Sequence, residues 1–325
     1  MTIRPVSGAS QTVEHQAVHV PPESVFVPPI AAGLVQRSRW MLGRMPPTPS
    51  ARRQRVGIEL RKMRDAAGTT TAEASTVLGV DRTKITLIEQ ALYAVTPERV
   101  TALARKYGET DDAFVSALAT MAGDRSKGWW EEYRGAVPLG FLDLAEQEYY
   151  AKAMQSYQIC HPPGPMQSER YSRAIFRNAQ TPLTPRIVET RVEHRMRRAD
   201  ILMSEGAAPY TAIVHEAALR MQFGGREVLR EQLNWMLELS ERSHITLRVI
   251  SFDSGGFMGS GQALIYMNGP VPRLDTVQYD TVEGPTFLHT TEHLEKYRGL
   301  MKVMTERSLS VDGSRDLISK IKKEL

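Results

Sequence analysis

The chain has little cysteine, no long apolar run and no strong net charge, and each of these shortages excludes a class of protein. A single cysteine, Cys160, cannot support an intrachain disulfide framework or a zinc site built from several cysteines. We expect the Cys160 side chain to be buried. No apolar stretch approaches the ~20 residues that a membrane-spanning helix needs. The N-terminal region also lacks a signal-peptide core, so we expect a cytoplasmic protein without a membrane partner.

The net charge of +4 over 325 residues is too small to indicate a nucleic-acid partner by itself. The distribution of charge is more informative, because nine basic residues and only one acid lie between residues 37 and 64. The basic residues are Arg37, Arg39, Arg44, Arg52, Arg53, Arg55, Arg61, Lys62 and Arg64, and the acid is Glu59. Such a segment is typical of a phosphate-binding surface, although solvated charge runs have the same composition.

The length of 325 residues exceeds that of one typical small domain, and the composition and periodicity change along the chain, so we predict three segments. Residues 1–48 are rich in proline and lack periodicity, which predicts a flexible arm. Arginines of this arm could enter a minor groove, and a disordered tail is the simpler interpretation. Residues 49–122 have the apolar spacing of an all-α bundle, and residues 123–325 mix helical and strand patterns. The expected fold class is therefore an N-terminal all-α bundle followed by a mixed α/β domain.

Capping residues divide the bundle into five expected helices. The first covers residues 50–68, where apolar residues repeat at helical spacing. Thr70 and Glu73 form a capping box that opens the second helix, and Asp81 is a suitable N-cap for the third. The fourth and fifth are expected at about residues 96–107 and 111–121.

Residues 123–325 alternate between helix-like and strand-like runs. Strands are expected at residues 210–215, 245–252, 263–267 and 276–279, and helices at about 143–156, 184–203, 226–242, 292–306 and 313–323. Because a helix separates the first two strands, residues 210–252 predict a βαβ unit.

The most specific motif lies between residues 60 and 92, where a glycine turn separates two short helices. Gly79 permits the tight turn, and Val80 fills the space between the helices. Ile85 and Ile88 bury one face of the second of these helices. On this spacing the segment resembles the lambda-repressor-like, xenobiotic-response-element family of helix-turn-helix proteins. The residues that carry the resemblance are Gly68, Thr70, Glu73, Leu78, Gly79, Val80, Ile85, Ile88 and Glu89.

The resemblance implies that residues 49–122 bind double-stranded DNA, with the third helix in the major groove. Arg82 is the first candidate for reading a base, because arginine can bond two acceptors of guanine, and a phosphate contact is the alternative. Thr83 also stands at the base edges, with Thr86 one turn later and Lys84 directed toward the DNA backbone. The other implied contacts are Leu87 in the groove and Thr70 and Thr71 at a phosphate, where Thr70 can also act as a simple cap.

Two positions depart from the family pattern. Leu87 stands where the family often has a polar or basic residue, so only an apolar contact, such as one with a thymine methyl group, is available there. Thr71 stands where glutamine is common, which shortens the reach to phosphate. Arg64 and Glu89 match a pair that forms an internal ion pair in the family, and the resemblance therefore implies a structural role for both.

From about Trp129 onward the chain resembles the domain of unknown function that follows this helix-turn-helix in regulators of actinomycete development and secondary metabolism. The matching segments are residues 171–174, Arg195, Arg198, residues 215–220, 224–225, 232–233 and 249–252. The loop at residues 162–168 departs from the family pattern. The resemblance implies a transcriptional regulator whose gene often neighbours that of a small partner protein, and it supplies no settled ligand. We also expect the C-terminal domain to form a homodimer and to sense an effector or a partner protein.

Enzymatic activity is not expected, because we find no convergent catalytic set. His289 and His293 lie one helical turn apart without a third ligand candidate, so we assign no metal site and no cofactor. Glu216 and Arg220 could line a pocket or form a salt bridge. An alternative to the DNA-binding hypothesis is a protein-interaction module with a repurposed helix-turn-helix, which Leu87 and the modest net charge favour.

Overall fold

The computed structural model describes residues 48–281 and 284–325. The predicted flexible arm, residues 1–48, falls outside the described residues except for its last position, and so does the hypothesis that its arginines enter a minor groove. Of the helices described, none is both long and apolar enough to cross a membrane.

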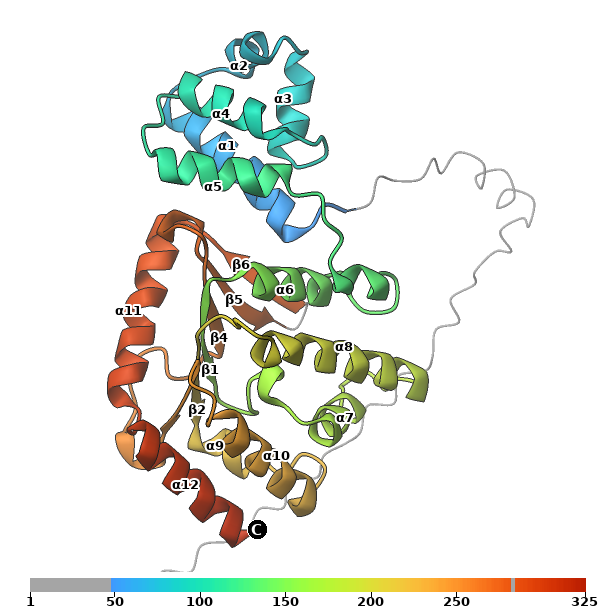
Figure 1. Cartoon of the computed structure of the whole chain (residues 1–325), viewed down its shortest axis with the longest axis vertical. Coiled ribbons are helices and arrows are strands. Elements are labelled where there is room, and N and C mark those ends of the chain that lie inside the picture. The colour runs from blue at the N-terminus through green and yellow to red at the C-terminus, as the bar shows by residue number, and fades with distance from the viewer. Residues whose placement is uncertain (1–47, 282–283) are drawn as a thin grey trace, which may run out of the picture. The chain divides into compact units, whose positions relative to one another are not determined.

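Five helices occupy the region after Ser50, in the order that the sequence predicts (Figure 1). They are α1 (Ala51–Ala66), α2 (Thr71–Leu78), α3 (Arg82–Glu89), α4 (Pro97–Lys106) and α5 (Asp112–Gly123). Their buried side chains form one core, in which Leu60, Phe114 and Leu118 are each 0% exposed. A single shared core explains why such short helices are stable, since helices of this length are marginal alone.

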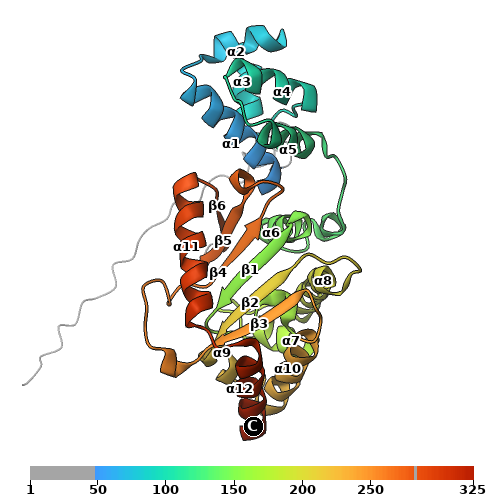
Figure 2. The same ribbon diagram turned by 60° about the vertical axis from the view of Figure 1, so that its left-hand side comes forward.

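The remaining residues form a six-stranded mixed sheet with helices on both faces (Figure 2). The strands are β1 (Ala153–Gln158), β2 (Tyr210–His215), β3 (Ile245–Ile250), β4 (Leu264–Asn268), β5 (Thr276–Thr281) and β6 (Gly284–Leu288). The α-helices are α6 (Leu139–Tyr150), α7 (Glu169–Arg177), α8 (Pro185–Met203), α9 (Glu216–Arg220), α10 (Arg226–Leu239), α11 (Thr291–Arg307) and α12 (Val311–Glu324). Short 3-10 turns, η2 (Trp129–Tyr133), η3 (Gly164–Met166), η4 (Phe252–Ser254) and η5 (Pro272–Leu274), complete the domain. The expected fold class is thereby confirmed.

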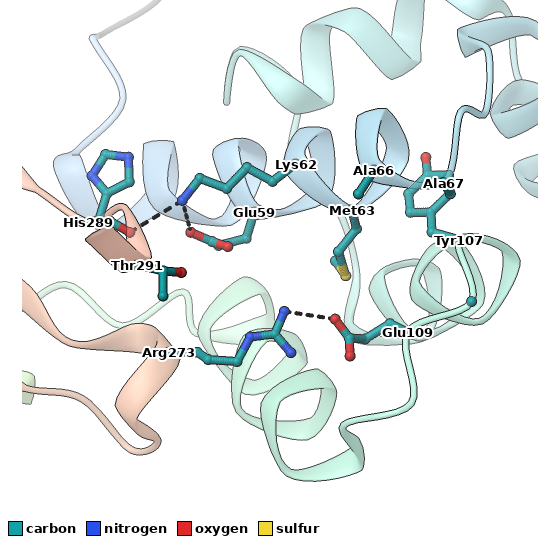
Figure 3. Close-up of a pocket in the computed structure, with 11 residues that line it drawn as sticks. Glu59, Lys62, Met63, Ala66, Ala67, Tyr107, Glu109, Arg273, His289 and Thr291 are labelled. Carbon is teal, nitrogen blue, oxygen red and sulfur yellow. Dashed lines mark hydrogen bonds and ion pairs between the residues drawn. The ribbon is translucent and has the colours of Figure 1, made fainter. Parts of the chain in front are cut away.

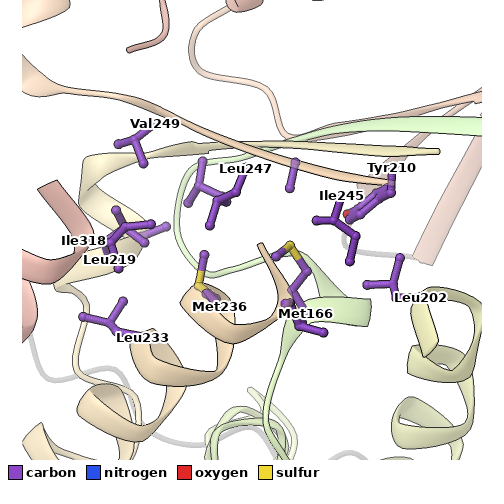
Figure 4. Packing of buried hydrophobic residues seen from close by; sticks show 14 of the residues in the cluster. Met166, Leu202, Tyr210, Leu219, Leu233, Met236, Ile245, Leu247, Val249 and Ile318 are labelled. Atoms are coloured by element: carbon purple, nitrogen blue, oxygen red, sulfur yellow. The ribbon is translucent and has the colours of Figure 1, made fainter. Parts of the chain in front are cut away.

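The strand order β3-β2-β1-β4-β5-β6 places the earliest strand near the middle of the sheet. β1, β2 and β3 pair in parallel, and β4, β5 and β6 pair antiparallel. The expected βαβ unit corresponds to β2, α10 and β3. Alternate residues of each strand face opposite layers, so one cluster packs against α11 and a larger one packs against α10 and α12. Figure 4 shows the larger cluster, with Met236 beneath Leu247 and Ile318 beside Leu219.

The helix expected over residues 143–156 is wrong beyond Tyr150, because residues 153–158 form β1. This strand has a polar composition, yet Ser156 is 0% exposed at the centre of the sheet. Its hydroxyl group is 2.7 Å from the Tyr210 hydroxyl on β2. A buried hydrogen bond supplied by a distant strand makes a polar residue acceptable in a core, and periodicity alone does not detect it.

Three elements and one side chain also differ from expectation. β6, α7 and α9 have no counterpart among the predicted elements. β6 is a short strand at the edge of the sheet, and all five of its residues are half-buried. Cys160 is exposed, so the expectation that it is buried is wrong. It lies two residues after the end of β1, outside the sheet.

One buried ion pair joins two helices on the same side of the sheet. Arg198 on α8 donates from Nε and Nη2 to both carboxylate oxygens of Glu148 on α6, at 2.8 and 2.6 Å. Both side chains are almost completely buried, so each charge depends on the other. The pair fixes α6, which also contacts α1 of the N-terminal bundle.

Candidate DNA-binding surface

The turn between α2 and α3 has the geometry that its sequence predicts. Gly79 adopts φ 60° and ψ 39°, a left-handed conformation that a residue with a Cβ rarely adopts. The Val80 amide donates to the Ser75 carbonyl oxygen at 3.1 Å, which closes the C-terminal end of α2. The Asp81 carboxylate then accepts from the Thr83 amide at 2.7 Å and starts α3.

α3 has one buried face and one exposed face. Ile85 and Ile88 are 1% and 2% exposed and anchor the helix in the core of the bundle. Four of the predicted contact residues, Arg82, Thr83, Lys84 and Thr86, are exposed, and Leu87 is half-buried. The structure therefore brings four of the five predicted α3 contacts to solvent, and Leu87 lies at the edge of the surface.

A residue that the sequence analysis missed adjoins this surface. The Tyr93 ring is 40% exposed, and the Lys84 ammonium group lies 5.6 Å from its centre. The amides of Leu92 and Tyr93 both donate to the Leu87 carbonyl oxygen, at 2.8 and 3.1 Å. These bonds hold the segment against the end of α3. The sequence signal for this residue was a pair of large apolar side chains, Leu92 and Tyr93, a few residues after the end of α3.

Thr70 and Thr71 lie at the start of α2, where a phosphate contact was predicted. The Thr70 hydroxyl group donates to Glu73 at 2.7 Å and accepts from the Glu73 amide at 3.2 Å, so the alternative role as a cap is present. Hydrogen bonds from the Thr70 amide and hydroxyl keep the pKa of Glu73 below its ordinary value. A charged carboxylate at this point repels phosphate, which leaves the half-buried Thr71 as the better placed of the two.

The charge of this bundle is nearly balanced. Residues 49–122 contain eleven lysines and arginines and nine acids. At the start of α3, Asp81 stands directly before Arg82, and hydrogen bonds to Thr83 keep the pKa of Asp81 below its ordinary value. Affinity for a phosphate backbone therefore depends on where the exposed cations lie and not on the net charge.

Arg64 and Glu89 meet between α1 and α3, as the resemblance implies. Arg64 donates from Nε and Nη2 to the two oxygens of Glu89 at 2.6 and 2.9 Å, and from Nη1 to the Thr69 carbonyl oxygen at 3.1 Å. The two side chains are 12% and 7% exposed. Arg64 thus connects three segments of the bundle, and its guanidinium group is not free for DNA.

Several basic residues of the run between residues 37 and 64 do not form a phosphate-binding surface, so that interpretation is wrong for them. Arg55 is 5% exposed and donates to the carbonyl oxygens of Arg273 and Asp275 at 2.6 and 3.2 Å. Burial lowers the pKa of Arg55, and the Glu59 carboxylate, 2.8 Å from its Nε, opposes that shift. Arg52 lies over the Tyr150 ring, 3.8 Å from its centre. These side chains face the C-terminal domain.

Figure 3 shows Lys62 in the same region, bonded to Glu59 at 2.9 Å and to the His289 carbonyl oxygen at 3.2 Å. The residues around it enclose a polar pocket between α1, the end of α4, η5 and the start of α11. Arg273 closes one side through a 2.8 Å contact with Glu109. Burial, together with Arg55 and Lys62, lowers the pKa of His289 to about 4, so this imidazole is neutral.

The C-terminal domain also contributes an apolar residue to the core of the bundle. Leu274, at the end of η5, is 5% exposed and belongs to the same cluster as Phe114 and Leu118. The next residue, Asp275, accepts hydrogen bonds from the Tyr266 hydroxyl at 2.7 Å and the Gly269 amide at 2.9 Å. The two domains are therefore joined by packing as well as by ion pairs.

Among residues 48–281 and 284–325, no group of three or more histidine, cysteine, aspartate or glutamate side chains is arranged to hold a metal ion. Of the two roles considered for Glu216 and Arg220, the salt bridge is the one present, at 2.8 Å. The second Glu216 oxygen accepts from the Phe252 amide at 3.0 Å, so both oxygens of the carboxylate are engaged.

Comparison with known families identifies two regions of the chain. A family model described as a helix-turn-helix domain matches residues 55–117. A second, described as a domain of unknown function (DUF5753), matches residues 141–320. No curated protein and no solved structure matches the chain.

Proposed function

Because the chain belongs to the family described as a domain of unknown function (DUF5753) and carries a helix-turn-helix domain before it, we propose that it is a sequence-specific DNA-binding transcriptional regulator. The observation that carries the proposal is the exposed N-terminal half of α3, held on a rigid buried face by Ile85 and Ile88. Helix-turn-helix proteins insert the N-terminal end of the motif's second helix, which corresponds to α3 here, into the major groove.

In the proposed complex, Arg82 and Thr83 read base edges, and Thr86 and Leu87 approach the groove one turn later. Lys84 and Thr71 contact phosphates, and the Tyr93 ring beside Lys84 widens that contact. Arg64 and Glu89 hold the scaffold and make no contact with DNA. The proposed class is the lambda-repressor-like, xenobiotic-response-element type found in actinomycete regulators.

The C-terminal domain forms the homodimer in this proposal and receives an effector or a small partner protein encoded nearby. A dimer is supported by the general match between two-fold proteins and palindromic operators. In this proposal the protein acts in the cytoplasm and is not an enzyme, since its sequence offers no convergent catalytic set.

The test is selection of a duplex from a random DNA library with the full-length protein, followed by affinity measurements as the salt concentration rises. The proposal expects enrichment of one sequence, and a binder that neutralises several phosphates loses about 10³–10⁵-fold in affinity between 50 and 200 mM salt. Failure to enrich any sequence would overturn it.

A second candidate function is a protein-interaction module in which the helix-turn-helix binds another protein. Its support is the apolar character beside α3, where Leu92 is 50% and Tyr93 40% exposed, together with the nearly balanced charge. This alternative predicts DNA binding that is weak, unselective in sequence and insensitive to salt, so the same experiment discriminates between the two.

A further inference from the structure

A mostly apolar cavity of about 340 Å³ lies between the two domains, apart from the α3 surface. The bundle contributes α1 and α5 to its wall, and the C-terminal domain contributes α6, the end of β4 and η5. Its size is within the range of small-molecule sites, which cover about 300–1,000 Å³ and occur preferentially at domain interfaces.

The wall of the cavity is mostly apolar, as is typical of a small-molecule site. Met121, Met267 and Leu274 present apolar surface to the cavity, and the Tyr150 ring, one face of which is covered by the Arg52 guanidinium group at 3.8 Å, also lines it. Methionine adapts its shape to irregular apolar partners, and an aromatic ring favours a ring-containing ligand. A ligand that fits this cavity is therefore an apolar body of up to about three rings.

The charged groups of the cavity determine the polar part of the ligand. Arg52 is 3.6 Å from Asp124, so these two largely neutralise each other. Lys152 is exposed at the rim and, among residues 48–281 and 284–325, forms no ion pair. Its amide donates to the Asn268 carbonyl oxygen at 2.8 Å, which fixes the backbone at this point. One cation remains available to a ligand.

We propose that this cavity binds a small molecule with an apolar, ring-containing body and a single anionic group, the body between Met121 and Met267 and the anion at Lys152. Because the walls come from both domains, a bound ligand stabilises the contact between the bundle and the C-terminal domain. It thereby limits how far the bundle can move relative to that domain when DNA binds. Only this effect on DNA binding rests on the proposed function, because the small molecule binds in the cavity without any contact with α3.

Two matched fluorescent probes test the site on the full-length protein without DNA. Anilinonaphthalene sulfonate has an aromatic body and one anionic group, and phenylnaphthylamine is its neutral counterpart. Both are expected to bind saturably and to compete for one site. Ala117→Phe fills the cavity from α5 and lowers the affinity for both by about tenfold or more, because overpacking opposes an occupant. Ala113→Phe, at an exposed position of the same helix, leaves both unchanged.

The charge of the ligand is tested with Lys152→Gln. This change weakens binding of the sulfonate by roughly two- to fivefold, as expected for a rim ion pair, and leaves the neutral probe unchanged. Thr120→Phe, which fills the cavity from its exposed side, replaces Ala117→Phe if that variant does not fold. Probe affinities that both filling variants leave unchanged would overturn the site, and equal effects of Lys152→Gln on both probes would overturn the anionic group.

The same protein samples separate this inference from the proposed function. A protein that selects a DNA sequence but binds neither probe contradicts the cavity site alone. A protein that binds both probes at one site but selects no DNA sequence contradicts the proposed function and leaves the site intact.

Discussion

Arg64 and Glu89 form a two-armed ion pair that joins α1 to α3, with N–O distances of 2.6 and 2.9 Å. Hydrogen bonding to Glu89 raises the pKa of Arg64 above its ordinary value. Because Arg64 also donates to the Thr69 carbonyl oxygen, the pair fixes the segment that leads into α2. The orientation of the α3 surface therefore depends on a contact that lies behind it.

Replacement of Arg64 by alanine should lower the free energy of unfolding by about 3–5 kcal/mol, because it leaves the shielded Glu89 carboxylate without a counter-ion. Chemical denaturation measures the change. Arg105→Ala is the matched control, since Arg105 is exposed on α4, and it should cost less than about 0.5 kcal/mol. Equal losses of unfolding free energy in the two variants would show that the Arg64–Glu89 ion pair does not stabilise the protein more than an exposed arginine does.

Gly57 lies where α1 crosses the end of α3 and has no room for a side chain. A Cβ there would lie 2.4 Å from the Glu89 carbonyl oxygen and 2.7 Å from that of Ile88. Glycine to alanine in a helix ordinarily stabilises a protein by about 0.5–1 kcal/mol. Gly57→Ala should instead destabilise it by about 1–3 kcal/mol, because the backbones must separate.

Gly299 on α11 is the control for this reversal of sign. A Cβ at Gly299 meets nothing within 4 Å, so Gly299→Ala should stabilise the protein by about 0.5–1 kcal/mol. Thermal denaturation of both variants measures the two signs. If Gly57→Ala also stabilises the protein, the close contact between α1 and α3 is not present in solution.

Arg55 should determine whether the two domains unfold together. Arg55→Leu removes its bonds to the carbonyl oxygens of Arg273 and Asp275 and leaves the buried Glu59 with Lys62 alone. Calorimetry of the wild-type protein should show one cooperative transition for the described domains, and the variant should show two. Arg61→Leu is the control on the same helix, because that side chain is 65% exposed, and a single transition should remain.

His194 should make the protein less stable in mild acid. It is 1% exposed between the rings of Trp129 and Tyr133, and burial, with Arg198 and Arg195 nearby, lowers its pKa from 6.5 to about 3. Between these values only the unfolded chain takes up the proton, so stability falls as the pH falls from 6.5 toward about 3.

His194→Gln should remove this contribution, which amounts to about 1.4 kcal/mol for each pH unit in that window. Denaturant titrations at several pH values compare the slope of stability against pH in the two proteins. A variant whose slope equals that of the wild-type protein would mean that His194 is protonated in the folded state.

The features that the sequence predicted well are those set by neighbours along the chain. The Thr70–Glu73 capping box, the Asp81 cap and the Gly79 turn depend on residues within a few positions, and all three are present. Arg64 and Glu89 are farther apart, and the family resemblance supplied their pairing.

The features that the sequence did not predict depend on distant partners. β1 contains three polar residues among six, and the hydroxyl group of Tyr210 on β2 satisfies the buried Ser156 at the centre of the sheet. Arg55 belongs to a basic run that suggested phosphate binding, but its acceptor at Asp275 is 220 residues away. Charge runs and strand patterns describe composition, whereas burial is decided by which surfaces the fold brings together.

The central claim is that the N-terminal end of α3 reads base pairs. Fluorescence anisotropy with the selected duplex and a scrambled duplex measures it most directly, on the wild-type protein, the Arg82→Ala/Thr83→Ala double variant and the Lys302→Ala control on α11. The double variant is expected to lose about ten- to a hundredfold in preference for the selected duplex, while its affinity for the scrambled duplex changes little. The control keeps the full preference. An undiminished preference in a folded double variant would contradict the assignment of α3 as the reading helix.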